Sequence, residues 1–262
     1  MALMSGKKGL VIGIANDRSY AWHIANALKI HGAELMFTNL PGEKMERRVR
    51  SAVADLGLTD PWIRPLDATD DAMIEKVFAQ AAEHAGGKLD FIVHSIAFAD
   101  KTYLELGKFI ETPKEVYLQA MEVSAYTFVS MARAARPFMM DGGSILGMTY
   151  YGAEKVVPGY NVMGVAKAAL ECTCRYLSAE LGRTGKGIRI NSISGGPLKT
   201  LSAMGVGGFS TMLDHVASRA PLGRNIEGGE VGDTAVWLLS DMSTGVTGQT
   251  IYVDAGYCVM GM

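Results

Sequence analysis

A tyrosine and a lysine in the second half of the chain have the residue types and the spacing for acid chemistry at a carbonyl group. Tyr160 and Lys167 are seven residues apart at the start of a stretch that reads as a helix, Tyr160–Gly182. Seven residues make nearly two helical turns, so both side chains lie on one face. An ammonium beside a phenol favours the phenolate and can hydrogen-bond a ribose, and the phenol can donate to a developing oxyanion. Taken alone, the pair fits a buried aromatic residue and a solvated lysine even better.

A turn near the N-terminus has the position of a phosphate-binding turn. The segment Gly13–Ala21 follows the first apolar run and leads into an amphipathic stretch. In a strand–turn–helix unit, backbone N–H groups at the helix start face a bound pyrophosphate. Gly13 provides the tight turn, but Ser19 and Ala21 stand where later small residues of the glycine-rich fingerprint are expected. This segment alone therefore supports a structural turn nearly as well.

Polar residues follow two later strands. Asp67 and Ala68 come after the third strand, where a carboxylate can accept from an adenine amine. Asp67 could equally be a helix N-cap, because Asp70 nearby also favours a helix start. His94–Ala97 follows the fourth strand and is expected to face the same crevice.

The end of the second strand bears on the choice of nucleotide. Asn39–Pro41 contains no carboxylate to accept from a 2′-hydroxyl, and Arg47 and Arg48 follow only after several residues. Both NADH and NADPH stay open at this point.

The elements that must position these residues alternate along the chain as short apolar runs and longer amphipathic stretches. This pattern predicts an α/β fold in one domain, residues 1–262: a Rossmann-like, doubly wound, seven-stranded parallel sheet with helices on both faces. The predicted strands are Lys8–Ile14, Glu34–Thr38, Trp62–Leu66, Phe91–His94, Ser144–Thr149, Ile188–Ile193 and Thr250–Val253. The predicted helices are Tyr20–His31, Glu43–Leu56, Asp70–Ala85, Pro113–Met140, Tyr160–Gly182 and Glu227–Ser240.

One region interrupts the alternation. Residues 195–225 are rich in glycine, contain two prolines, and hold one short amphipathic piece, Phe209–Arg219. We expect this region to be a substrate-binding lid within the same domain rather than a linker.

Charge and composition exclude several classes of protein. With 25 basic and 27 acidic residues, the net charge is -2, which gives no field for gripping nucleic acid or an anionic membrane. No run of 18 apolar residues occurs, so we expect no membrane insertion. Cys172, Cys174 and Cys258 are too few for a disulfide framework and too irregularly spaced for tetrahedral zinc. We therefore expect no metal site and a reduced, cytoplasmic protein.

The motifs together resemble the enoyl-acyl carrier protein reductases of bacterial fatty-acid synthesis, a divergent branch of the short-chain dehydrogenases/reductases. Six residues separate Tyr160 from Lys167, where other members of the superfamily have three, and a second tyrosine, Tyr150, lies ten residues upstream. Further matching segments occur in order along essentially the whole chain: Gly13–Ala21, His94–Ile96, Gly196–Thr200 and Val253–Gly256.

The resemblance implies an oxidoreductase acting on a CH–CH group. Such an enzyme reduces the trans-2 double bond of enoyl thioesters carried by acyl carrier protein, with hydride from NADH or NADPH, in type II fatty-acid synthesis. By the same resemblance, Tyr160 hydrogen-bonds the thioester carbonyl and stabilises the enolate, Lys167 holds the nicotinamide ribose, and Tyr150 shapes the thioester end of the pocket. A homotetramer is also implied.

The resemblance further implies two sets of binding residues. The nucleotide-contacting positions are Gly13, Ser19, Tyr20, Leu40, Asp67, Ala68, Ile96, Lys167, Leu198, Lys199, Thr200, Leu201 and Ser202. The positions of the acyl pocket and its lid are Ala97, Phe98, Ala99, Met163, Pro197, Val206, Phe209 and Met212. Their apolar character suits a hydrocarbon tail.

The chain departs from its relatives at two of these positions. Leu40 stands where relatives often have an amide that reads the adenosine, and Ala97 replaces a glycine that they often have beside the nicotinamide. Two alternatives stay open: a short-chain carbonyl or hydroxy dehydrogenase with a drifted motif, and a noncatalytic nicotinamide-binding sensor.

Overall fold

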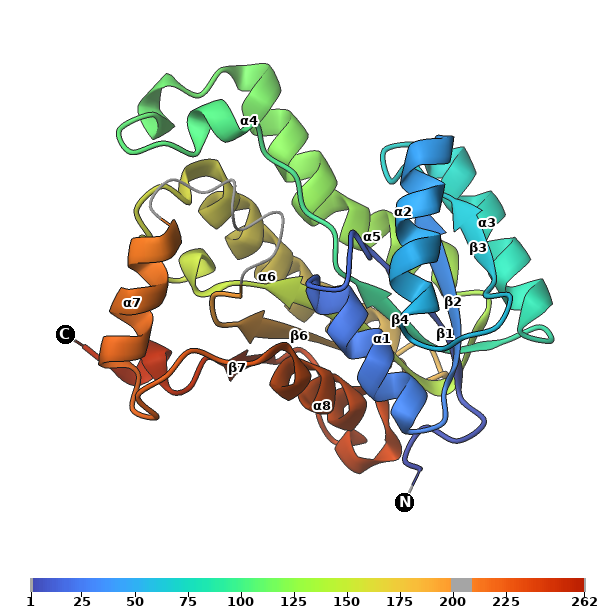
Figure 1. Cartoon of the computed structure of the whole chain (residues 1–262). Helices are drawn as coiled ribbons and strands as arrows, with labels where there is room; N and C mark the ends of the chain where they lie inside the picture. Colours follow the sequence, from blue (N-terminus) through green and yellow to red (C-terminus); the bar gives the residue numbers. More distant parts are fainter. Residues whose placement is uncertain (1, 199–208, 262) are drawn as a thin grey trace.

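The computed structural model describes residues 2–198 and 209–261, in which a central sheet has the strand order β3-β2-β1-β4-β5-β6-β7 (Figure 1). Every neighbouring pair of these strands is parallel, as the unbroken apolar runs predicted. The strands are β1 (Lys8–Ile12), β2 (Glu34–Asn39), β3 (Ile63–Pro65), β4 (Leu89–His94), β5 (Met139–Thr149), β6 (Arg189–Gly195) and β7 (Thr250–Val253).

The chain begins in the middle of the sheet and adds strands first on one side and then on the other. β2 and β3 extend the sheet beyond β1, and the chain then returns to place β4 against the other edge of β1. In doubly wound sheets the crevice at such a switch point, outside the carboxyl ends of the strands, is where ligands bind. The predicted Rossmann-like fold is confirmed, and its switch point lies between β1 and β4.

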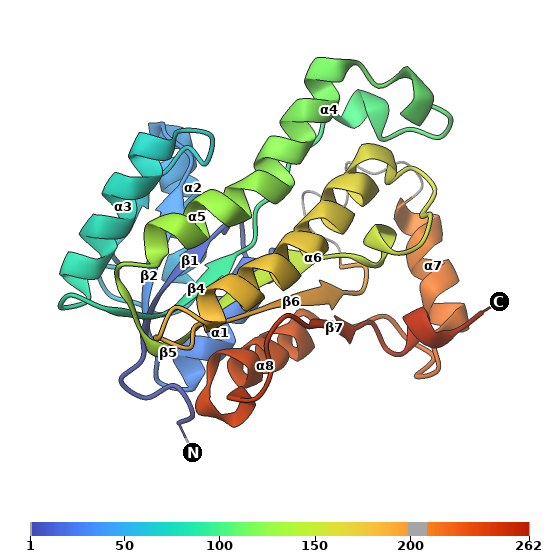
Figure 2. The same ribbon diagram turned by 180° about the vertical axis from the view of Figure 1, so that it is seen from behind.

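Helices cover both faces of the sheet (Figures 1 and 2). One hydrophobic core joins the sheet to α1 (Tyr20–Ile30), α2 (Glu43–Ala54) and α8 (Gly228–Leu239). The other joins it to α3 (Asp71–His84), α5 (Thr127–Ala135) and α6 (Asn161–Gly182). The strand alternation divides the two: Val11 packs in the first core, while its neighbours Leu10 and Ile12 pack in the second.

Two further helices lie beyond the carboxyl ends of the strands, α4 (Lys114–Met121) and α7 (Phe209–Arg219), as Figures 1 and 2 show. The bounds of α7 coincide with the amphipathic piece predicted inside residues 195–225.

The prediction of one continuous helix over Pro113–Met140 is wrong. α4 passes through a π-helical turn, Glu122–Tyr126, into α5, and Met139 already begins β5. A π turn adds a residue without removing the apolar face, so the periodic pattern does not reveal it. α5 ends at Ala135, two residues before Pro137, which has no N–H for a further helical hydrogen bond.

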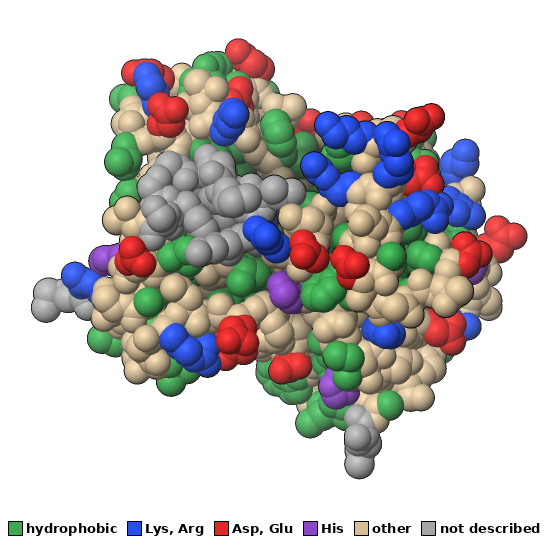
Figure 3. All heavy atoms as spheres, in the orientation of Figure 1, with side chains coloured by type: hydrophobic (Ala, Val, Ile, Leu, Met, Phe, Trp, Pro, Cys, Tyr) green, Lys and Arg blue, Asp and Glu red, His purple; other side chains and the backbone are tan. Residues whose placement is uncertain are grey.

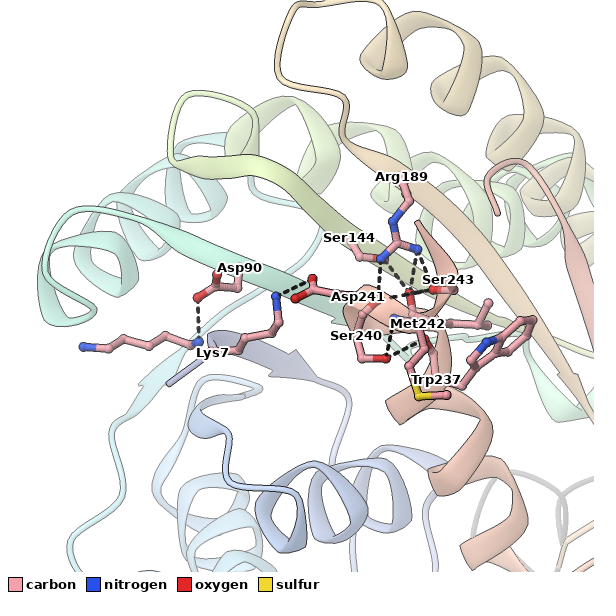
Figure 4. Close-up of polar contacts among 11 residues, drawn as sticks. Lys7, Asp90, Ser144, Arg189, Trp237, Ser240, Asp241, Met242 and Ser243 are labelled. Atoms are coloured by element: carbon pink, nitrogen blue, oxygen red, sulfur yellow. Dashed lines mark hydrogen bonds and ion pairs between the residues drawn. The ribbon is translucent and has the colours of Figure 1, made fainter. Parts of the chain in front are cut away.

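A polar network secures the amino ends of the strands, opposite the crevice (Figure 4). The buried guanidinium of Arg189, the first residue of β6, donates to the carbonyl oxygen of Leu238 at 2.8 Å and to that of Ser240 at 3.1 Å. Nearby, Lys7 pairs with Asp241 at 2.9 Å. The network ties the end of α8 to the sheet.

Replacing Arg189 by alanine is expected to lower the free energy of unfolding by about 2–4 kcal/mol, because a packed stem and the donors to two backbone carbonyls are lost. Denaturant unfolding followed by circular dichroism measures the change. Arg133→Ala is the matched control: Arg133 forms an exposed ion pair with Asp71, which is worth at most about 1 kcal/mol. Equal losses in the two variants would contradict a stabilising role for the network.

Candidate active site

A cavity of about 390 Å³ at the carboxyl ends of the central strands brings the three predicted catalytic residues together. Tyr150 enters it from the end of β5, and Tyr160 and Lys167 enter it from the start of α6. The rings of Tyr150 and Tyr160 meet edge to face, with centroids 4.9 Å apart. A Cβ at Gly152 would overlap the Tyr160 ring, so the glycine allows that ring to lie against the backbone.

The Tyr160 hydroxyl is held in its protonated form. Removal from solvent raises the pKa of Tyr160 well above its ordinary value, and Tyr150 and Tyr20 add to the shift. The phenol therefore stays neutral near pH 7, the form that the sequence reasoning gave to the donor at an oxyanion. A neutral phenol is a hydrogen-bond donor, which is the form needed to stabilise an oxyanion.

Lys167 lies on the buried side of α6, only 5% exposed, and its Nζ donates to the carbonyl oxygen of Met148 at 2.8 Å. Burial lowers the pKa of Lys167 to about 8, while Glu171, one helical turn further on, acts in the opposite direction. The ammonium is thus the major form at neutral pH, but it is lost over a moderate rise in pH.

The predicted phosphate turn follows β1 directly. Gly13 has φ +108, and a Cβ there would overlap the carbonyl oxygen of Ser95, which follows β4. This close approach explains why β1 ends at Ile12 and not at the predicted Ile14. Ser19 and Tyr20 line the cavity that contains Tyr160 and Lys167. The Tyr20 hydroxyl donates to the carbonyl oxygen of Gly196.

A second cavity, of about 380 Å³, adjoins the first along the crevice. The two share Gly13 and Ser95–Phe98 in their walls, so together they form one elongated site. Besides the shared Gly13 and Ile96, the second cavity is lined by three further predicted nucleotide positions, Leu40, Asp67 and Ala68. A crevice of this form, closed by a glycine that approaches the neighbouring strand, fits an extended dinucleotide.

The interpretation of Asp67 as a helix N-cap is wrong. Asp67 Oδ1 accepts from the N–H of Thr69 at 2.9 Å and from its hydroxyl at 2.7 Å, whereas Asp70 caps α3 by accepting from the N–H of Met73. Asp67 therefore forms a local turn at the cavity wall and is not the N-cap.

Basic side chains gather over α2, beside the second cavity (Figure 3). Of these, Arg48 lines the cavity wall together with Asn39 and Leu40. Arg48 thus lies beside the last residue of β2 and the residue after it, although it comes several residues later in the sequence.

The predicted acyl-pocket residues line the first cavity where the structure describes them. These are Ala97, Phe98, Ala99, Met163, Pro197 and Met212, with Ile96 and Leu198 from the nucleotide set beside them. Lys199, Thr200, Leu201, Ser202 and Val206 lie outside the described residues, as does the side chain of Phe209 at the start of α7. The Tyr150 hydroxyl donates to Met212 Sδ at 3.3 Å, which links α7 to the pair of tyrosines.

Some lining residues had no signal in the sequence. Lys101 and Leu104 belong to an irregular segment after β4 and form part of the first cavity's wall. Ser124 in the π turn binds the chain closer to β4, at Phe98. Its hydroxyl accepts from the N–H of Phe98 and donates to the carbonyl oxygen of the same residue.

His94, which the sequence placed at the crevice, lies behind it. The ring is fully buried and its Nε2 bonds the hydroxyl of Thr127 at 2.8 Å. Burial lowers the pKa of His94 to about 3, with Lys167 adding to the shift, so the ring is neutral.

Neither a metal centre nor a membrane helix is found in residues 2–198 and 209–261. No three histidine, cysteine, aspartate or glutamate side chains of these segments group as a metal site, and their helices lack the combined length and apolar character for crossing a bilayer.

Comparison with known proteins gives a consistent set of relatives. A family model described as Enoyl-(Acyl carrier protein) reductase matches residues 13–258. The chain is 49% identical to the enoyl-acyl-carrier-protein reductase (NADH) FabI of Synechocystis sp., over 99% of both proteins. The solved Bacillus cereus enoyl-acyl carrier protein reductase with NADP+ and indole naphthyridinone superposes with TM-score 0.95, at 45% identity over 100% of both chains. The Anaplasma phagocytophilum reductase in complex with NAD gives TM-score 0.92 at 45% identity, covering 99% of this chain and 97% of that one.

Proposed function

Because this chain belongs to the enoyl-acyl carrier protein reductase family, we propose that Tyr160, Lys167 and Tyr150 carry out its reaction. The enzyme is an NADH-dependent oxidoreductase that reduces the trans-2 double bond of enoyl thioesters in fatty-acid synthesis. The observation that supports these residue roles is a single cavity in which a protonated Tyr160, a buried Lys167 and an apolar wall meet.

NADH, when bound, supplies the hydride that adds to the β-carbon of the enoyl thioester. Negative charge then develops on the thioester carbonyl oxygen, and the Tyr160 hydroxyl donates a hydrogen bond to it. A donor already fixed in a partly dry site stabilises such charge without reorganising at the moment of reaction. Tyr150 supports the ring of Tyr160 from the side and narrows the thioester end of the cavity.

Lys167 would hold the nicotinamide ribose with its ammonium. Nζ carries three donors, and among residues 2–198 and 209–261 one of them goes to the Met148 carbonyl oxygen, which leaves donors in this part of the chain for ribose hydroxyl groups. Gly13, Ser19 and Ile96 would form the wall along the pyrophosphate and nicotinamide, and Leu40, Asp67 and Ala68 the wall around the adenosine. Arg48 at that end favours acceptance of NADPH as a second nucleotide, since a guanidinium binds phosphate well.

The acyl tail would pass along the apolar residues of the first cavity, with residues 195–225 as its lid. Pro197, Leu198 and Met212 support the lid assignment, because they come from this region and line the cavity. The substrate would be delivered by acyl carrier protein. A homotetramer and a cytoplasmic location complete the proposal, the latter supported by three free cysteines.

One steady-state comparison tests the function: NADH against NADPH, each with crotonyl and dodecenoyl thioesters. We expect oxidation of NADH with both thioesters, and faster turnover with NADH than with NADPH. Protein that oxidises neither nucleotide would contradict the proposal. Oxidation of an alcohol with NAD+, in place of enoyl reduction, would favour the short-chain dehydrogenase alternative.

A further inference from the structure

Asn161, the residue after Tyr160, has an unusual backbone conformation. It begins α6 with φ +42, in the left-handed region that residues other than glycine seldom occupy. Asparagine and aspartate tolerate this region better than most side chains. A strained residue held directly beside a catalytic group is a recognised sign of a positioning role.

The side chain of Asn161 binds a segment that contributes to the wall of the cavity. Its Nδ2 donates to the carbonyl oxygen of Tyr103 at 2.7 Å and to that of Glu105 at 2.8 Å. Both hydrogens of the amide are therefore used on two carbonyls of one short segment.

This segment forms part of the acyl pocket. Leu104 lies between the two bonded carbonyls, is 7% exposed, and packs with Met163 of α6 in a small hydrophobic cluster that also contacts Tyr160. Lys101 and Leu104 line the catalytic cavity. This part of the wall is thus fastened to the residue that follows Tyr160.

We propose that Asn161 is a positioning residue for the reduction: it fixes the wall at residues 101–105 relative to the Tyr160 hydroxyl, so that a thioester carbonyl is presented to that hydroxyl. The inference rests on the proposed role of Tyr160. Two requirements coincide at this position, a left-handed backbone and two N–H donors. Aspartate and glycine meet the first requirement but not the second, which makes them the informative substitutions.

The experiment compares Asn161→Asp and Asn161→Gly with the wild type. Asn26→Asp is the control, an amide-to-acid change at a half-buried position in α1. Measurements are kcat and KM with NADH and either crotonyl or dodecenoyl thioester, the NADH dissociation constant by fluorescence titration, and Tm. We expect both Asn161 variants to lose about 10- to 100-fold in kcat with both thioesters, as the loss of two hydrogen bonds implies. NADH affinity should stay within about twofold of the wild type, and Asn26→Asp should retain wild-type kcat.

Three outcomes would overturn the inference. Wild-type kcat in Asn161→Gly would show that the side chain is dispensable. A loss of kcat accompanied by an equal loss of NADH affinity and a large decrease in Tm would show a merely structural role. Absence of enoyl reduction in the wild type would overturn the proposed function itself, and this inference with it.

Discussion

A Tyr160→Phe variant is expected to lose about 10²–10³-fold in kcat while binding NADH as the wild type does. The substitution keeps the ring against Tyr150 and Gly152 and removes only the hydroxyl. Because the carbonyl oxygen carries most of its charge in the transition state, the loss falls on kcat rather than on ground-state binding. Single-turnover kinetics with crotonyl thioester and NADH measures the chemical step directly.

Tyr176→Phe is the matched control, since Tyr176 lies on the same helix and is 76% exposed. That variant should keep the wild-type kcat. Unchanged turnover in Tyr160→Phe would remove Tyr160 from the reaction and would favour a noncatalytic nicotinamide-binding protein.

A Lys167→Ala variant is expected to bind NADH about 10- to 100-fold more weakly, because hydrogen bonds from a charged donor are lost in a buried site. Turnover should fall as well. Fluorescence titration gives the dissociation constant, and Lys88→Ala, an exposed lysine just before β4, is the control. An unchanged dissociation constant in Lys167→Ala would contradict the ribose role.

The same lysine predicts how NADH binding depends on pH. Burial lowers the pKa of Lys167 in the free protein to about 8, so the ammonium is present below that pH and is lost as the pH rises through it. NADH affinity should therefore be constant below about pH 8 and decline above it. In Lys167→Arg the guanidinium stays charged, so any remaining affinity should not decline over this range. A decline of the same size in both proteins would assign the titration to another group.

The sequence is sufficient for most of the architecture. Strands covered on both faces consist of nearly unbroken apolar residues, so β4 and β6 could be located to within two residues at each end. The π turn could not, because the inserted residue leaves the buried faces of α4 and α5 apolar. The catalytic trio depended on a family resemblance, since the spacing of Tyr160 and Lys167 alone fits an ordinary amphipathic helix.

Details of the site that depend on backbone atoms had no signal in the sequence. The partner of Lys167 is a main-chain carbonyl, which every residue possesses. The wall at Lys101 and Leu104 lies in a segment without periodicity, and the bonds from Asn161 also end on main-chain carbonyls. The neutral state of the Tyr160 phenol also could not be obtained from the spacing, because burial of the side chain causes it.

The Arg189 network and the catalytic cavity lie at opposite ends of the same strands. β6 has seven residues, which separates its two ends by roughly 20 Å. Changes at sites so far apart usually combine additively, so Arg189→Ala and Tyr160→Phe should not influence each other's effect. Mutational robustness and catalytic performance are therefore separable in this chain. Directed evolution could first raise the free energy of unfolding with substitutions at the amino ends of the strands. The added stability would then tolerate destabilising substitutions in the acyl pocket.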